Sequence, residues 1–126
     1  MITFKDNLLY TKNNEWAEKI DDVIRVGIDD YSQASLGDIV HIELPKNGTH
    51  VLAGQAFGEI EATKSVSSIN APVSGVVVRV NEAVKDSPSL VNIDPFGEGW
   101  LAEIFPENLS ELSSLMDINA YKEYIR

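Results

Sequence analysis

The chain has 126 residues, of which 44% are apolar and 24% charged, and its formal net charge is −10. This length fits a single domain with a buried core, and the usage is that of a globular protein. The negative charge argues against nucleic-acid binding, because phosphate contacts need clustered Lys and Arg. The absence of cysteine excludes disulfides, thiolate nucleophiles and cysteine-ligated zinc.

The amino-terminal segment lacks the features of a targeting signal. Residues 1–6 have neither the basic start nor the long apolar run of a secretory signal peptide. No apolar run approaches the ~20 residues that a membrane span needs. We therefore expect a cytoplasmic protein that does not bind membranes. Its acidity either serves solubility or docks the chain onto basic partner surfaces.

The first predicted elements are a strand and a short helix. Residues 8–17 form an apolar-aromatic stretch, and residues 23–28 are rich in β-branched residues, which is typical of a strand. Residues 29–36 predict one or two helical turns. Asp29 or Asp30 would cap the start of this helix, and Gly37 would end it.

Short strands separated by turns follow from Asp38 onward. The segment 45–48 is a strong turn signal. Regularly spaced short strands indicate a sandwich or barrel. They are expected at residues 39–44, 51–55, 56–62, 66–72 and 76–81.

A weak internal repeat relates two of these strands. Residues 37–44 resemble residues 74–81, each being a small turn residue followed by a β-branched strand and a polar turn. Two such halves packed face to face would leave Lys64, which lies between them, at an exposed end. Chance similarity among short valine-rich strands is the alternative explanation.

The carboxyl-terminal part, from about residue 106 to 126, has a helical pattern. Residues 106–116 predict one helix, with apolar side chains at helical spacing: Leu109, Leu112, Leu115 and Met116. Asp117 can cap a second helix. Its apolar stripe would consist of Ile118, Tyr121 and Ile125. We interpret these stripes as core packing.

Lys64 is the candidate functional residue. It lies between Thr63 and Ser65, two small hydroxyl residues, with strand-like segments on both sides. A lysine that is to be modified must project from a tight and rigid tip, with small neighbours that let the modifying enzyme approach. Taken alone, this pattern is weak, because most exposed lysines only add solubilising charge.

Further residues in the same order along the chain strengthen the pattern. The segment Glu61-Ala62-Thr63-Lys64 resembles the Glu-Ser-Val-Lys of the glycine cleavage H-protein family. Matches to other motifs of that family stand at residues 71–77, 80–81, 88–92, 99–100 and 115–117. The resemblance covers almost the whole chain. It implies one lipoyl-carrier domain over residues 1–126, with a carboxyl-terminal helical tail.

The resemblance implies both a fold and a cofactor. The fold would be mainly β, a barrel-sandwich hybrid of two small sheets, with a short helix after the first strands and helices at the carboxyl terminus. Lipoate would be joined to Lys64 by an amide bond, with Glu61, Thr63 and Ser65 as the context of the hairpin tip. We expect the core to include Val26, Ile28, Ile39, Val40, Val73, Val76, Val78, Val80, Leu90, Leu101 and Ile104.

The resemblance also implies the partners. Glycine decarboxylase would place an aminomethyl group on the arm, an aminomethyltransferase would pass the one-carbon unit to tetrahydrofolate, and dihydrolipoyl dehydrogenase would reoxidise the dithiol. A separate lipoate-attaching enzyme would modify Lys64. The chain itself would be a carrier without catalysis of its own.

One motif near the amino terminus departs from the family. The family usually has His-Glu-Trp, whereas this chain has Asn14-Glu15-Trp16. In the family the glutamate lies in the cleft that receives the loaded arm, so the resemblance assigns Glu15 a contact with the cationic aminomethyl group. The alternative for Glu15 is a solvated surface charge.

Four other functions compete with this prediction. A biotin carrier usually flanks its lysine with methionines, and a 2-oxo acid dehydrogenase lipoyl domain usually has Asp-Lys-Ala. A lipoate relay, which hands its lipoyl group to other carriers, would look the same at Lys64. An enzyme is disfavoured, because the only histidines, His41 and His50, suit a strand and a turn, and no nucleophile–base pair stands out. Four acidic residues could bind a metal, but each also suits a helix cap or a solvated face: Asp29, Asp30, Asp38 and Glu43.

Overall fold

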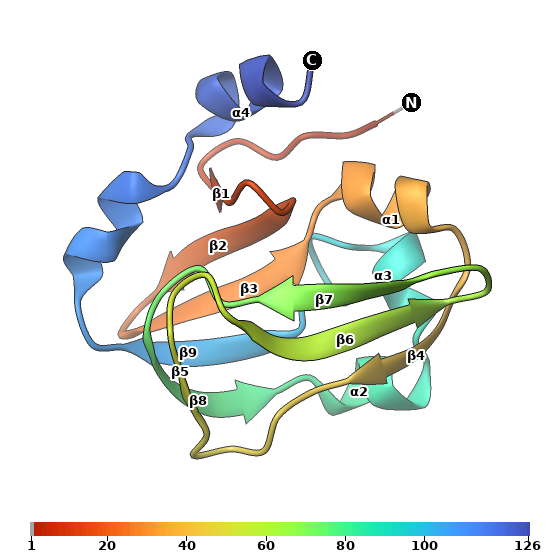
Figure 1. Cartoon of the computed structure of the whole chain (residues 1–126), viewed down its shortest axis with the longest axis horizontal. Helices are drawn as coiled ribbons and strands as arrows, with labels where there is room; N and C mark the ends of the chain where they lie inside the picture. Colours follow the sequence, from red (N-terminus) through yellow and green to blue (C-terminus); the bar gives the residue numbers. More distant parts are fainter. Residues whose placement is uncertain (1) are drawn as a thin grey trace.

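The computed structural model describes residues 2–126 and consists of two antiparallel sheets with short helices around them (Figure 1). The larger sheet has six strands, in the spatial order β1 (Leu9–Tyr10), β2 (Glu15–Ile20), β3 (Val23–Ile28), β9 (Ala102–Pro106), β8 (Gly75–Val80) and β5 (His50–Val51). The smaller sheet has three strands, in the order β4 (Ile39–Glu43), β6 (Ala56–Ala62) and β7 (Val66–Asn70). This arrangement confirms the mainly β fold class.

The core lies between the sheets because each sheet buries one face. In the smaller sheet, Ile42, Ile60 and Ile69 point inward, whereas Glu59 and Glu61 of β6 are exposed on the other face. These inward side chains pack against Leu101 and against the short helices of residues 82–93. A second core cluster lies toward the opposite end of the sheets and is built from Ala17, Ile24, Val26, Val51, Ala71, Val73, Val77 and Ile104.

Three of the predicted core residues are wrong. Val76 and Val78 are 36% and 42% exposed, because only one face of β8 is buried and Val77 between them occupies that face. Val40 is 53% exposed and sits where the pairing of β4 with β6 shifts register between Ile39 and His41. Val80 and Leu90 are only partly buried. The remaining predicted core residues are buried, as expected.

The first helix follows the prediction. Helix α1 spans Asp30–Leu36, and the carboxylate of Asp29 accepts a hydrogen bond from the amide of Ser32. Gly37 ends the helix in the left-handed region, at φ 81°, where glycine has no steric cost. Helix α2 (Glu82–Asp86) lies where we expected the polar turn that follows residues 74–81, and a further short helix, α3 (Leu90–Ile93), comes after it. Asn81 caps the first of them by accepting from Ala83.

The carboxyl-terminal region is partly different from the prediction. Residues 106–116 do not form one α-helix: Pro106 ends β9, and a 3₁₀-helix, η1, covers only Leu109–Ser114. A spacing of three between leucines suits the three residues per turn of a 3₁₀-helix. Helix α4 (Ile118–Tyr124) is capped by Asp117, as predicted. No helix among residues 2–126 is long and apolar enough to cross a bilayer.

A third hydrophobic cluster packs the amino-terminal and carboxyl-terminal segments against each other. Tyr121 of α4 stacks on Tyr10 of β1, with ring centroids 4.3 Å apart and planes within 5° of parallel. Leu8 and Trp16 complete the buried part of this cluster. The main chain of Tyr10 also exchanges hydrogen bonds with Met116, at 2.7 and 2.9 Å. The carboxyl-terminal segment therefore packs over the strands that carry Glu15 (Figure 1).

Candidate functional site

Lys64 lies at the tip of the β6–β7 hairpin. The ladder runs from the Ala56–Asn70 pair to the Glu61–Val66 pair, and the amide of Ala62 then donates to the carbonyl of Ser65 at 2.8 Å. Only Thr63 and Lys64 lie beyond that pair. Lys64 is exposed, and its ammonium makes no ion pair with any carboxylate of residues 2–126. The amine is therefore presented to solvent by a short, well-paired turn.

The tip is held from the side by the loop that precedes β4. The amide of Thr63 donates to the carbonyl of Asp38 at 3.1 Å. The side chain of Asn92, at the end of α3, in turn holds this loop: its Oδ1 accepts from the amide of Ile39 at 3.0 Å, and its Nδ2 donates to the carbonyl of Gly37 at 2.8 Å. Asn92 therefore links helix α3 to the loop that holds the hairpin tip.

The outer face of the smaller sheet beside the tip is acidic. Glu61 lies opposite His41 in the ladder, and Glu59 lies opposite Glu43. His41 contacts the carboxylate of Glu43 at 2.7 Å, and both side chains are largely exposed. His41 thus lies on a strand, as we expected, and its side chain is exposed. His50 lies in the short strand β5 rather than in a turn, and it pairs with Glu107.

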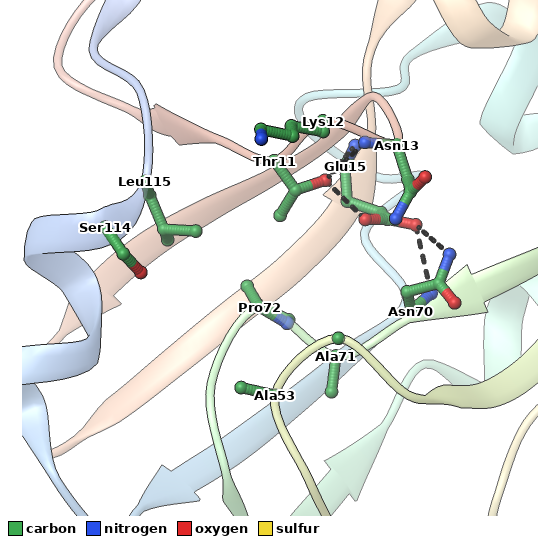
Figure 2. A pocket seen from close by; sticks show the side chains of 11 residues that line it. Thr11, Lys12, Asn13, Glu15, Ala53, Asn70, Ala71, Pro72, Ser114 and Leu115 are labelled. Carbon is green, nitrogen blue, oxygen red and sulfur yellow. Dashed lines mark hydrogen bonds between the residues drawn. The ribbon is translucent and has the colours of Figure 1, made fainter.

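A pocket of about 290 Å³ lies at the other end of the hairpin. It is bounded by the β1–β2 loop, by the end of β7 with the chain that follows it, and by the end of η1. The lining residues are Thr11, Lys12, Asn13, Glu15, Ala53, Gly54, Asn70, Ala71, Pro72, Ser114 and Leu115. Figure 2 shows the carboxylate of Glu15 between Thr11 and Asn70 at the head of this pocket.

Glu15 is the buried acid of the pocket. It is 1% exposed, and three donors hold its carboxylate: the Thr11 hydroxyl on Oε1, and the Asn70 amide (3.0 Å) and Nδ2 (3.1 Å) on Oε2. Burial raises the pKa of the Glu15 carboxyl, and the hydrogen bonds from Thr11 and Asn70 oppose that rise. Such a carboxylate lacks a cationic partner among its contacts and is suited to receive one.

The alternative of a solvated surface charge at Glu15 is therefore wrong. The structure also adds two residues that sequence reasoning missed, Thr11 and Asn70, which fix the carboxylate by hydrogen bonds. Thr11 precedes Glu15 by four residues, and a hydroxyl at that spacing is the only local signal. No local sequence pattern predicts the role of Asn70, because its contact with Glu15 spans 55 residues.

Asn14 is held on the side away from the pocket. Its backbone is in the left-handed region, at φ 68°, a conformation that asparagine tolerates better than most residues. Its Nδ2 donates to the hydroxyl of Tyr121 at 2.7 Å, and its main-chain carbonyl accepts from the main-chain amide of Asp29 at 3.0 Å. Tyr121 donates to the carboxylate of Asp29. Asp29 is thereby used as a cap and a hydrogen-bond acceptor.

Residues 2–126 contain no group of three or more His, Cys, Asp or Glu side chains that could hold a metal ion. The lysine tip and the Glu15 pocket are thus the two chemically distinctive places on the hairpin. Strand β7 separates them (Figure 1): Lys64 lies two residues before its first residue, Val66, and Asn70 is its last. At about 3.3 Å per residue, the strand from Val66 to Asn70 covers roughly 13 Å.

Comparison with known proteins identifies the family of the chain that carries Lys64 and the Glu15 pocket. Residues 8–126 match the family model described as "Glycine cleavage H-protein". The chain belongs to the glycine cleavage H-protein family. This membership confirms the resemblance based on the Lys64 segment, and with it the role of a lipoyl carrier in glycine cleavage.

Individual relatives agree across nearly the full length. A "Probable glycine cleavage system H protein" of Thermococcus kodakarensis is 52% identical over 124 residues, covering 97% of this chain and 92% of the relative. A "Glycine cleavage system H protein" of Anaeromyxobacter sp. (strain K) is 44% identical over 120 residues, covering 95% and 94%. The crystal structure of a glycine cleavage system H protein from Mycobacterium marinum is 37% identical, has a TM-score of 0.86 and covers 96% of this chain and 95% of that one.

Proposed function

We propose that Lys64 is the residue that carries the lipoyl group and that the Glu15 pocket receives the loaded end of the arm. The observation that carries this proposal is the pairing of an exposed lysine at one end of β7 with a buried carboxylate at the other end.

The residues around Lys64 fit a covalently attached group. Ala62, Thr63 and Ser65 leave the amine uncovered, so a lipoate-attaching enzyme can reach it from outside the sheet. A free lysine is mostly protonated at neutral pH, so that enzyme must supply both an activated acyl donor and a base. When attached, the dithiolane would supply an electrophilic disulfide: a nucleophilic carbon would bond to one sulfur with its electron pair, and the other sulfur would leave as a thiolate.

The pocket residues fit a cationic end group on that arm. The Glu15 carboxylate already has its hydrogen-bond donors, and a primary ammonium would add an opposite charge inside a partly enclosed site. Enclosure also keeps water away from an aminomethyl group bound to sulfur, which water would otherwise cleave. Glu15 and its supporting residues thereby stabilise the loaded form between partners.

The partners follow from this carrier role. Glycine decarboxylase, the tetrahydrofolate-dependent aminomethyltransferase and dihydrolipoyl dehydrogenase would each engage the arm of Lys64 in turn. Tethering raises the effective concentration of the arm at each of these active sites. The chain takes part in these reactions as a carrier subunit with no catalytic residue of its own.

Intact-protein mass spectrometry tests the attachment. Incubation with a lipoate-attaching enzyme, lipoate and ATP should add one lipoyl mass to the chain and none to Lys64→Arg, and peptide mapping should place it on Lys64. Modification of Lys64→Arg, or a biotinyl mass after incubation with a biotin ligase, would overturn the assignment. Reconstituted glycine cleavage with the three partner enzymes separates the carrier role from a lipoate relay, which would instead transfer its lipoyl group to another carrier.

A second assay tests Glu15. Glu15→Ala should release ammonia and formaldehyde from the loaded arm faster than the unsubstituted protein, because the carboxylate no longer stabilises the cation. Glu59→Ala is the matched control, because it removes an exposed carboxylate from the same hairpin without touching the pocket. An unchanged release rate in Glu15→Ala would contradict the role of Glu15.

A further inference from the structure

Strand β7 is an edge strand whose free side runs from the lysine tip to the pocket. It pairs only with β6 in the three-stranded sheet. The hydrogen bond from Ala62 to Ser65 makes that pair a hydrogen-bonded one, so residues 65, 67 and 69 direct their main-chain groups toward β6. The N–H and C=O groups of Val66, Ser68 and Asn70 therefore point away from the sheet.

Asn70 provides independent support for this alternation. Its amide donates to the carboxylate of Glu15 at 3.0 Å, which requires that the N–H points to the outer side of β7. Within residues 2–126, the amides of Val66 and Ser68 have no hydrogen-bond partner of this kind, and both residues are exposed. An exposed row of main-chain donors and acceptors is a template for pairing with another extended, peptide-like group.

The dimensions of the strand suit one such group. Three bonds of an extended main chain cover at most ~3.6 Å, so the five bonds from the Cα to the Nζ of Lys64 reach about 6 Å. Two residues of β7 cover about the same length. An amide formed on Lys64 therefore reaches the level of Val66, and the acyl chain beyond it extends toward Ser68 and the pocket.

From these relationships we propose that the open edge of β7 is a docking track for the modified Lys64 side chain. The outward N–H of Val66 donates to the carbonyl of the amide on Lys64, whose own N–H lies on the opposite side of the planar trans amide and faces away from the strand. The exposed side chain of Val66 does not take part in this bond. This inference rests on the proposed attachment at Lys64 and adds the residues that guide the arm from the tip to Glu15.

The edge position allows a selective test, because proline removes a donor without breaking the ladder. Val66→Pro deletes the outward N–H, and proline is tolerated on edge strands when its nitrogen faces away from the partner strand. Val66→Ala keeps the N–H and is the matched control. Thermal unfolding and mass spectrometry should first establish that both variants fold and that both accept the lipoyl group.

The direct readout is amide hydrogen exchange of the intact carrier, followed by NMR. On going from the unmodified protein to the aminomethyl-loaded protein, the amide of Val66 should exchange several-fold more slowly, whereas the already paired amide of Ser67 should change little. Val66→Pro should release ammonia and formaldehyde from the loaded arm roughly three- to tenfold faster, the range expected for the loss of one net hydrogen bond, and Val66→Ala should not.

The outcomes separate this proposal from the one on which it rests. Absence of lipoylation at Lys64 would refute the attachment itself. Normal lipoylation and a Glu15-dependent release rate, together with unchanged exchange at Val66 and an unchanged rate in Val66→Pro, would refute the track and leave the Glu15 pocket intact. If Val66→Pro does not fold, the exchange measurement on the unsubstituted protein decides the question alone.

Discussion

Asn14 donates a hydrogen bond to the hydroxyl of Tyr121, 107 residues further along the chain, at 2.7 Å. That hydroxyl donates in turn to Asp29, the cap of α1. Asn14, which immediately precedes Glu15, is thus connected through the Tyr121 side chain to helix α4 and to helix α1. Asparagine at this position, where the family usually has histidine, therefore has a structural role here.

Removal of the Tyr121 hydroxyl should destabilise the packing of Asn14 and of helices α1 and α4 against one another. Tyr121→Phe keeps the ring that stacks on Tyr10 but leaves Asn14 Nδ2 and one oxygen of Asp29 without a partner in a buried place. We expect a loss of roughly 2 kcal/mol in the free energy of unfolding, because unpaired buried polar groups are costly. Urea denaturation measures this loss.

Tyr124→Phe serves as the comparison for Tyr121→Phe. The hydroxyl of Tyr124, on the same helix, donates to the carbonyl of Lys12 at 3.1 Å in an exposed place, so its removal should cost only a few tenths of a kcal/mol. Equal losses in the two variants would contradict the importance of the Asn14–Tyr121–Asp29 contacts.

Asn92 should control the rigidity of the lysine tip from a distance. Asn92→Ala removes the bonds to Ile39 and Gly37, and thereby frees the loop whose Asp38 carbonyl holds Thr63. We expect faster hydrogen exchange at the Thr63 amide and slower lipoylation of Lys64, seen in kcat/KM of the attaching enzyme. Asn47→Ala, in an exposed turn, should leave both unchanged. Unchanged exchange at Thr63 in Asn92→Ala would show that the tip is held without this side chain.

The parts of the fold that could be predicted are those dominated by local chemistry. The Asp29 cap, the glycine stop at Gly37 and the Asp117 cap depend on residues within one helical turn, and all three are confirmed. Strand faces were less predictable. The β-branched run at residues 76–78 gives no alternation, so the choice of Val77 as the buried member depends on the packing of the sheets.

The residues of the candidate site also differ in whether they could be predicted from the sequence. The position of Lys64 between two small residues was visible in its immediate neighbours, and the Glu15 assignment came from resemblance to the family. The hydrogen bonds from Asn70 to Glu15, and those by which Asn92 holds the loop at Gly37 and Ile39, depend on contacts across more than fifty residues. No spacing rule anticipates them, because the sheets bring these segments together only after folding.

Gly75 illustrates a motif residue whose reason is steric. A Cβ on Gly75 would lie 2.1 Å from the carbonyl oxygen of Phe105 on the neighbouring strand β9, and neither main chain can move without breaking the ladder. Gly75→Ala should therefore cost roughly 3 kcal/mol or more in unfolding free energy. Gly54→Ala is the comparison: φ is +83° there, but nothing lies within 4 Å, so only the conformational cost of about 1 kcal/mol applies. A smaller loss in Gly75→Ala than in Gly54→Ala would contradict the steric explanation.

The buried carboxyl of Glu15 should also affect the pH dependence of stability. Burial raises its pKa above the ordinary 4.5, so between that value and the raised pKa the folded chain binds more protons than the unfolded chain does. The contribution of Glu15 to the free energy of unfolding therefore increases as the pH falls from neutral toward 4.5, and is lost as the pH rises through the raised pKa. Asp29, whose pKa burial also raises, acts in the same direction from its ordinary 3.8.

Glu15→Gln removes the titrating group while keeping most of the side-chain volume. Urea denaturation at a series of pH values from 7 down to 4.5 should give a stability that rises less steeply in Glu15→Gln than in the unsubstituted protein. Glu59→Gln, at an exposed position on the hairpin, should follow the unsubstituted protein throughout. Parallel curves for Glu15→Gln and the unsubstituted protein would mean that Glu15 titrates alike in the folded and unfolded chains. A carboxyl that is ionised without cost at neutral pH would in turn gain less from a cationic partner in the pocket, so this measurement also bears on the binding role of Glu15.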